Sequence, residues 1–315
     1  MINRLIVEVL FHKPLKELIG QAGKVHAENF NQNEVQLSSL LSIKTGGCPE
    51  NCSYCPQSAH YDTGVQKKKL MTTTEVKAAA SLAKASGATR FCLGAAWREV
   101  KDGPDFDDVL TMVREVKGLG LEVCCTLGML SVSQAQRLKE AGLYAYNHNL
   151  DSSRSFYSKI ISTRSYDDRL RTIENVRQSG ITVCTGGIIG MGETEEDRVD
   201  FLFQLASLEP HPESVTINSL IPIQGTPLES QISASALDLA RVIATARCLM
   251  PKSMIRLSAG RKPMSEEGQF LCFLAGANSI FLGDTLLTSD NPSVFSDYTL
   301  LAKVGMKAMD QELKP

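Results

Sequence analysis

The feature that most limits the possible fold is a regular alternation of short apolar segments with amphipathic helical segments along all 315 residues. The apolar segments have the length and the β-branched content of buried strands, and turn or capping residues separate them from the helical segments. Eight strands are expected, at residues 35–43, 89–93, 121–127, 143–147, 181–189, 214–220, 253–258 and 279–282. This rhythm predicts an α/β protein with a closed (β/α)8 TIM-type barrel, and an open doubly wound sheet is the alternative.

Capping signatures place the helices between these strands. Thr72 with Glu75 and Ser131 with Gln134 have the spacing of capping boxes, and Asp105 is a candidate N-cap. Helices are therefore expected at residues 12–29, 72–87, 105–118, 131–142, 165–180, 193–208, 234–250 and 265–275, and from about residue 297.

No linker or shift in composition divides the chain, so one domain over residues 1–315 is expected, with an N-terminal helical extension over residues 1–34 and a C-terminal tail and helix over residues 284–315. The 43% hydrophobic fraction supplies a sizeable core, and the net charge of −2 indicates no nucleic-acid partner. Residues 1–10 are too short and too charged for a signal peptide, and no apolar run reaches the length of a membrane span. These features predict a cytoplasmic protein without membrane contact.

Three of the nine cysteines are concentrated in one loop after the first strand. Cys48, Cys52 and Cys55 have the spacing C-x3-C-x2-C, which brings three thiolates to one soft metal centre and leaves one ligand position open. His60 could close a zinc site there, so a zinc-stabilised barrel that acts as a binding protein is one interpretation. An odd number of cysteines without a secretion signal favours metal binding or catalysis over disulfides. The cysteines expected in the apolar core are Cys125, Cys248 and Cys272.

Strand alternation predicts which side chains face the barrel interior, because successive residues of a strand point to opposite faces. The side chains expected inside are those of Arg90, Cys92, Glu122, Cys124, Thr126, Asn147, Asn149, Thr182, Cys184, Thr216, Asn218, Arg256 and Ser258, with Asp151 just beyond the fourth strand. Cys92, Cys124 and Cys184 would form a second thiolate-rich site deeper in the barrel than the cysteine loop. Arg256 is the candidate fourth member of that site.

These residues resemble the biotin synthase family of the radical S-adenosylmethionine (SAM) superfamily, and the likeness covers nearly the whole chain. It is carried by residues 44–61, 89–97, 124–128, 146–151, 183–187, 256–261 and 277–280. The resemblance implies that Cys48, Cys52 and Cys55 bind a 4Fe-4S cluster whose open iron chelates SAM. A 5′-deoxyadenosyl radical would then take hydrogen from dethiobiotin, and sulfur insertion would give biotin.

The same resemblance assigns further roles to interior residues. It implies that Cys92, Cys124, Cys184 and Arg256 ligate an auxiliary 2Fe-2S cluster that donates the sulfur. The residues expected to bind SAM are Tyr54, Asn149, Asp151, Gly186, Ile188 and Gly190. Those expected to bind dethiobiotin are Asn147, Asn149 and Asn218, whose amides suit a neutral ureido ring, with Thr288 and Ser289 near its carboxylate.

The resemblance also implies a homodimer, and a flavodoxin or ferredoxin as electron donor. An alternative within the superfamily is a radical enzyme that makes another product. The second set of cysteines with Arg256 favours sulfur insertion, because an enzyme that only rearranges carbon skeletons needs no sacrificial sulfur.

Overall fold

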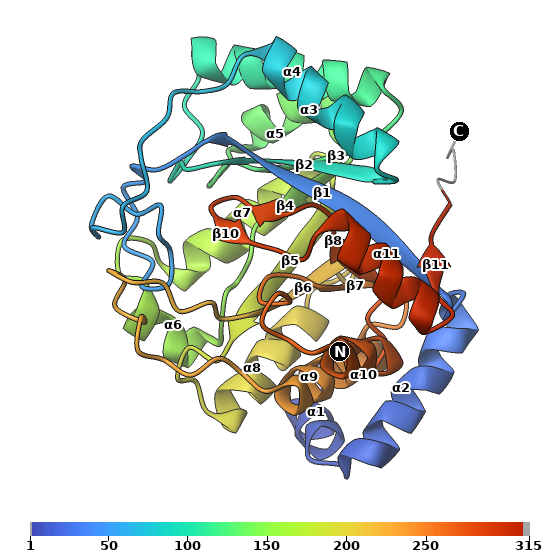
Figure 1. Ribbon diagram of the computed structural model, residues 1–315. Coiled ribbons are helices and arrows are strands. Elements are labelled where there is room, and N and C mark those ends of the chain that lie inside the picture. The colour runs from blue at the N-terminus through green and yellow to red at the C-terminus, as the bar shows by residue number, and fades with distance from the viewer. Residues whose placement is uncertain (1, 311–315) are drawn as a thin grey trace.

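Eight parallel strands close into a barrel in the computed structural model, which describes residues 2–310 (Figure 1). Each strand pairs with the next along the chain, and β1 also pairs with β8 through Gln36–Ser279, Leu37–Ile280 and Ser38–Phe281. The closing pair confirms the (β/α)8 barrel and excludes the open sheet. The strands are β1 (Glu34–Lys44), β2 (Arg90–Ala95), β3 (Glu122–Thr126), β4 (Ala145–Asn147), β5 (Thr182–Ile189), β6 (Ser214–Ser219), β7 (Met254–Leu257) and β8 (Ser279–Phe281).

Helices surround the barrel. They are α1 (Arg4–Phe11), α2 (Leu15–Asn29), α3 (Thr73–Ala85), α4 (Pro104–Gly118), α5 (Val132–Ala141), α6 (Arg154–Ile160), α7 (Tyr166–Gln178), α8 (Glu195–Ala206), α9 (Ala236–Leu249), α10 (Glu266–Leu274) and α11 (Val294–Lys303). The capping boxes at Thr72 and Ser131 are confirmed. No helix within residues 2–310 is both long and apolar enough to cross a membrane.

Three helix predictions were wrong in detail. The expected helix over residues 12–29 begins only at Leu15, because Pro14 occupies its N-cap, and a separate helix, α1, precedes it. Asp105 is not an N-cap: Gly103 takes that position and Pro104 is the first helical residue, where its missing N–H costs nothing. The last helix begins at Val294 rather than near residue 297, and α6 was not expected at all.

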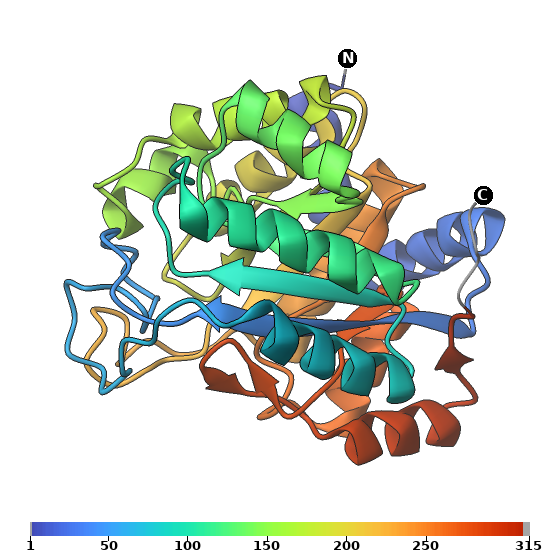
Figure 2. The same ribbon diagram turned by 90° about the horizontal axis from the view of Figure 1, so that it is seen from above.

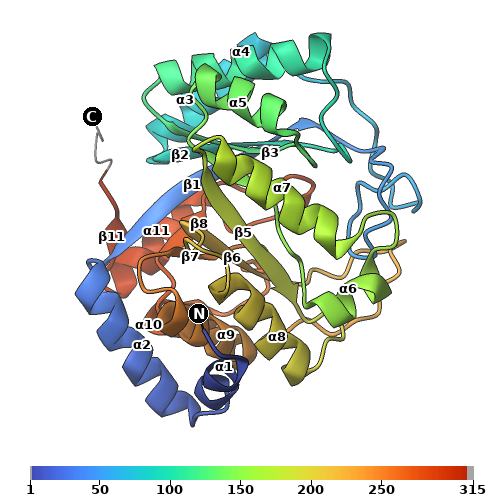
Figure 3. The ribbon, with the colours of Figure 1, turned by 180° about the vertical axis from the view of Figure 1, so that it is seen from behind.

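The first two helices extend the barrel on one side. Figure 3 shows α1 and α2 outside the ring, where α1 contacts α8 and α2 contacts α9. Arg4 Nε bonds Asp200 Oδ1 at 2.6 Å, and Arg241 Nη1 donates to the Phe11 carbonyl at 2.5 Å. Residues 2–34 therefore contain the expected helical extension; residue 1 lies outside the described part of the chain.

Strand parity sorts the core into an outer layer under the helices and an inner layer, as predicted. Cys125 lies in the outer layer with Leu93 and Val123. The inner apolar cluster consists of Cys92, Cys124, Ala145, Phe281 and Leu286. Cys272 also belongs to the outer core, whereas Cys248 is only partly buried against it.

The chain after β8 forms structure that the sequence did not predict. A short antiparallel hairpin of β9 (Thr285–Leu286) and β10 (Ser289–Asp290) follows the last barrel strand, and β11 (Lys307–Ala308) adds to the amino end of β1 (Figure 2). The buried Arg261 guanidinium holds α11 in place through Asp297, with Nη1–Oδ1 at 2.7 Å. The remainder of the predicted tail, residues 311–315, lies outside the described residues.

Candidate active site

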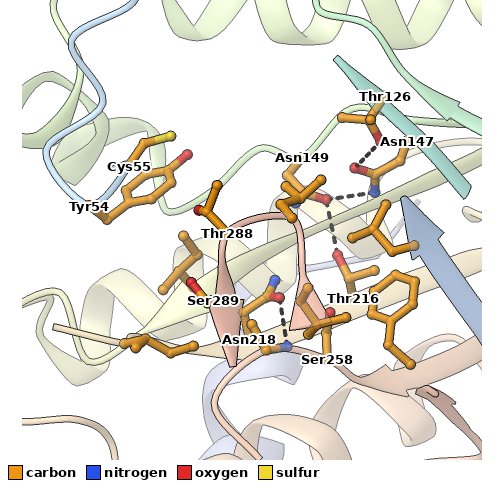
Figure 4. A pocket seen from close by; sticks show the side chains of 18 of the residues that line it. Tyr54, Cys55, Thr126, Asn147, Asn149, Thr216, Asn218, Ser258, Thr288 and Ser289 are labelled. Carbon is orange, nitrogen blue, oxygen red and sulfur yellow. Dashed lines mark hydrogen bonds between the residues drawn. The ribbon is translucent and has the colours of Figure 1, made fainter. Parts of the chain in front are cut away.

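One cavity runs from the cysteine loop into the barrel interior (Figure 4). Tyr54 and Cys55 line it at the loop, and Cys92, Cys124 and Arg256 line it from the strands. Between them stand the polar side chains of Thr126, Asn147, Asn149, Asp151, Thr216, Asn218 and Ser258, and the hairpin contributes Leu286, Leu287, Thr288 and Ser289. The cavity therefore brings together most of the side chains that the sequence placed in the site.

The cysteine loop is folded on itself by backbone hydrogen bonds. Cys48 N–H donates to the Gln57 carbonyl at 2.9 Å, and Gln57 Oε1 accepts from the Gly46 N–H at 3.0 Å. Burial raises the pKa of the Cys48 thiol, that of Cys52 to about 12 and that of Cys55 to about 11. The three thiols are thus protonated at neutral pH without metal, and metal binding must displace their protons.

The donor set of this loop fits an iron–sulfur cluster better than one zinc ion. Within residues 2–310, no group of three or more His, Cys, Asp or Glu residues is arranged around one ion position. His60 is exposed, with Nε2 only 3.0 Å from the Pro49 carbonyl, so the zinc interpretation gains no support. A cluster distributes its thiolates over several irons, so they need not converge on one point. Three thiols without a fourth protein ligand would leave one iron of such a cluster without a protein ligand.

Asp151 links the loop to the barrel. Its carboxylate accepts from the Tyr54 hydroxyl at 2.8 Å and from the Arg169 guanidinium. Asp151 has a φ of +67°, and its carbonyl accepts from the Ile188 N–H at 2.8 Å. Gly187 is required beside it, because a Cβ there would lie 2.5 Å from the Asp151 carbonyl oxygen. Sequence reasoning missed Arg169, since nothing local to α7 indicates this partner.

A buried ionic cluster supports the loop from the other side. Glu50 Oε1 lies 3.2 Å from Arg164 Nη2 and 3.5 Å from Arg98 Nε. Burial, with Arg169 and Arg164 nearby, lowers the pKa of His148 well below its ordinary range, so the imidazole is neutral. Its Nε2 lies 3.5 Å from Arg164 Nη1, so this histidine is part of the buried cluster.

The amides of the cavity are joined to one another. Asn147 Nδ2 donates to Asn149 Oδ1 at 3.0 Å, and Asn149 Oδ1 also accepts from Thr216 Oγ1 at 3.0 Å (Figure 4). Asn218 is held by backbone: it donates to the Gly187 carbonyl at 2.9 Å and accepts from the Ala259 N–H at 3.1 Å. The three amide planes are therefore fixed before a ligand arrives.

The deeper thiols lie on the inner faces of β2, β3 and β5. Cys92 pairs in register with Cys124, and Cys184 with Asn147, whose Nδ2 is 3.3 Å from Cys184 Sγ. A hydrogen bond from the Cys124 thiol lowers the pKa of Cys92 and raises that of Cys124. Arg256 is buried, with Nε 3.0 Å from Ser279 Oγ, Nη2 3.0 Å from Ser38 Oγ and its plane over Phe281.

Of the residues expected around SAM, four line the cavity and two glycines do not. Ile188 lines the cavity together with Tyr54, Asn149 and Asp151. Gly186 stands in β5 where any Cβ would strike the Thr216 carbonyl, and Gly190, at φ +99°, gives its N–H to Glu193 Oε1 at 2.8 Å. The two glycines shape the backbone beside the cavity rather than its lining.

Comparison with known proteins places this site in a class. The chain matches the Radical SAM superfamily over residues 42–205 and the Biotin and Thiamin Synthesis associated domain over residues 216–307. It superposes on methylornithine synthase with a TM-score of 0.81 at 23% identity, covering 98% of this chain and 94% of that one. It superposes on HydG, a maturase of the [FeFe]-hydrogenase, with a TM-score of 0.81 at 17% identity, covering 98% and 72%. The fold and the cysteine loop at the cavity thus define a radical SAM barrel enzyme.

Closer relatives narrow the class. The chain is 60% identical over 304 residues to the biotin synthase of Myxococcus xanthus (strain DK1622), covering 96% of this chain and 88% of that protein. It is 58% identical over 304 residues to that of Synechococcus elongatus (strain ATCC 33912 / PCC 7942 / FACHB-805), covering 96% and 95%. The chain belongs to the biotin synthase family.

Proposed function

We propose that this enzyme converts dethiobiotin to biotin by inserting sulfur between two carbon atoms. The observation that carries the proposal is that one cavity is lined by thiols of two separate sets, by Cys55 from the loop and by Cys92 and Cys124 from the barrel interior. One metal centre would serve hydrogen abstraction and the other would provide sulfur. A radical enzyme that lacks sulfur chemistry has no use for the second set.

Cys48, Cys52 and Cys55 would hold a 4Fe-4S cluster that binds SAM at its open iron. When bound, the cluster and SAM supply the one-electron chemistry that hydrogen abstraction from unactivated carbon requires and that no side chain offers. The chain's own task is to position the reactants and exclude water. Tyr54, Asn149, Asp151 and Ile188 would contact SAM from the cavity wall, with Gly186 and Gly190 shaping the wall behind them.

Cys92, Cys124, Cys184 and Arg256 would hold a 2Fe-2S cluster as the sulfur source. Their fit rests on the donor set: three buried thiols on the inner faces of β2, β3 and β5, and the buried guanidinium of Arg256, which lines the same cavity. We propose these four side chains as the ligands of the second cluster.

Dethiobiotin would lie between the two thiol sets. Its ureido ring is neutral and carries two donors and one acceptor, which suits the amides of Asn147, Asn149 and Asn218. Thr288 and Ser289 on the hairpin would receive the carboxylate end. We further propose one domain over residues 1–315, a homodimer, and a flavodoxin or ferredoxin as electron donor.

The test is the iron and acid-labile sulfide content of anaerobically reconstituted protein, with its visible spectrum before and after dithionite. About six irons per chain, four plus two, would support both clusters and lead to an assay with dethiobiotin. About four irons would favour a radical SAM enzyme with another product. Zinc without iron would refute the proposal.

A further inference from the structure

A chain of hydrogen-bonded polar side chains lies near the amino ends of β1, β2 and β3. Arg256 Nη2 contacts Gln36 Oε1 at 3.4 Å, and Gln36 Nε2 contacts Glu122 Oε2 at 3.4 Å. Glu122 in turn accepts from Arg90, with Nε at 2.9 Å and Nη2 at 2.8 Å. The two barrel arginines are thus connected through a glutamine and a carboxylate.

The Arg90 guanidinium is hydrogen-bonded along one edge, and its carbon lies 5.3 Å from the centre of the Tyr144 ring. The side chain is 4% exposed, and both nitrogens of that edge bond Glu122. The remaining nitrogen, Nη1, is buried without any partner among the described residues. Burial opposes the charge of Arg90, but Glu122 and the thiols of the deeper set, Cys124, Cys92 and Cys184, raise its pKa. Arg90 stands two residues before Cys92 on the same face of β2, so the unused donor belongs to a guanidinium on the barrel face that carries the thiols.

Ser214 presents a second unused donor, beside Cys184. It is 2% exposed, and its hydroxyl is also buried without a partner. Ser214 pairs in register with Cys184 across β5 and β6, so both side chains point into the barrel. Two buried donors without acceptors thus border one set of thiols from different strands.

Buried donors without acceptors are rare in native proteins, because each has lost its water and gained nothing in return. We infer that Arg90 Nη1 and Ser214 Oγ donate hydrogen bonds to sulfur atoms of the cluster held by Cys92, Cys124 and Cys184, and that they raise its reduction potential. This inference rests on the second cluster of the proposed function. Hydrogen bonds to cluster sulfurs stabilise the more negative, reduced state and are a main control of potential.

Two substitutions test the two donors separately. Ser214→Ala removes only an unpartnered hydroxyl. Arg90→Lys keeps the positive charge for Glu122, but its single ammonium cannot bond Glu122 and reach the cluster with the geometry of the planar guanidinium. Thr185→Val is the matched control, because the Thr185 hydroxyl is also buried without a partner but stands one position along β5, on the outward face.

The measurement is the midpoint potential of each cluster in the reconstituted holoprotein, together with iron and sulfide content. We expect Ser214→Ala and Arg90→Lys each to lower the equilibrium constant for reduction of the 2Fe-2S cluster about tenfold, which is about 59 mV for one electron. The 4Fe-4S potential should be unchanged, and Thr185→Val should change neither potential. The metal-free Ser214→Ala protein should melt no lower than the parent, because the hydroxyl bonds nothing there.

An unchanged 2Fe-2S potential in both Ser214→Ala and Arg90→Lys, at full iron and sulfide content, would overturn the inference and leave the cluster assignment standing. A parent protein that takes up only one cluster would instead refute the second site itself, and the inference with it. Equal shifts in Thr185→Val would also contradict the inference, because the effect would then not depend on facing the thiols.

Discussion

The Tyr54 hydroxyl donates a 2.8 Å hydrogen bond to Asp151 Oδ2 across 97 residues of sequence. This contact ties the cysteine loop to the end of β4, where Arg169 holds the same carboxylate. Both Asp151 and Arg169 are buried, so this carboxylate connects Tyr54 and Arg169 in the interior of the protein.

Substitutions of Tyr54 and of Asp151 should therefore lower the free energy of unfolding by different amounts. Tyr54→Phe should lower the free energy of unfolding by about 1 kcal/mol, the value of one hydrogen bond. Asp151→Asn should lower it by about 3 kcal/mol or more, because Arg169 is left buried without its counter-charge. Urea unfolding of the metal-free protein measures both. A larger loss for Tyr54→Phe than for Asp151→Asn would contradict the importance of the ion pair.

The two thiol sets should separate two activities. Cys52→Ala should abolish cleavage of SAM, because it would remove one of the three ligands proposed for the 4Fe-4S cluster. Cys184→Ala should retain some cleavage and lose biotin formation. 5′-Deoxyadenosine and biotin are quantified from the same reaction. Cys272→Ala, which changes a cysteine of the outer core, is the control. Equal loss of both products in the two variants would refute the division of labour.

Substitution of Asn147 should weaken the binding of dethiobiotin. Asn147→Asp keeps the shape but replaces the amide donor, which contacts Asn149 and Cys184, by a carboxylate oxygen. The KM for dethiobiotin should rise at least about tenfold, which corresponds to about 1.4 kcal/mol of lost binding. Asn29→Asp, on the exposed end of α2, is the control. An unchanged KM would place the ureido ring elsewhere in the cavity.

The burial of His26 should weaken the fold in acid. Burial, assisted by Arg247, lowers the pKa of His26 from its ordinary value of 6.5 to about 4. As pH falls below 6.5, the unfolded chain binds this proton and the folded chain does not until about pH 4, so stability is lost over that window. The loss is about 3 kcal/mol. His26→Gln should flatten the decline of the melting temperature between pH 7 and 4, and an unchanged slope would contradict this.

The Arg261–Asp297 pair should anchor the chain segment after β8. Arg261→Met leaves Asp297 buried without a cation and should cost about 3–5 kcal/mol at pH 7. Burial already raises the pKa of Asp297 and Arg261 opposes that rise, so the variant should regain stability as the pH falls and Asp297 takes a proton. The double variant Arg261→Met with Asp297→Leu should recover most of the loss. Chemical unfolding at pH 7 and pH 5 distinguishes these cases.

The sequence was sufficient for the barrel and for which side chains enter it. Strand alternation alone placed Cys92 and Cys124 inside and Cys125 outside, because one face of each strand must pack under the helices. Capping boxes located several helix starts, because a capping box lies within four consecutive residues. The short elements were missed, since seven-residue α6 and the two-residue strands of the hairpin have no period long enough to detect.

The supporting ion pairs could not be predicted. Glu50 and Arg164 are 114 residues apart, and Asp151 and Arg169 belong to a strand end and a helix that pack only in the folded barrel. Many acidic and basic side chains along the chain could have paired equally well. Likewise, the missing partners of Arg90 and Ser214 become visible only when every neighbour is in place.

The cavity is lined at one end by the cysteine loop and the hairpin and at the other by Cys92, Cys124 and Arg256. A molecule held by the amides between them would have Cys55 toward one end and the thiols of the barrel strands toward the other. One bound ligand would therefore lie within reach of chemistry from two opposite directions without having to move between them.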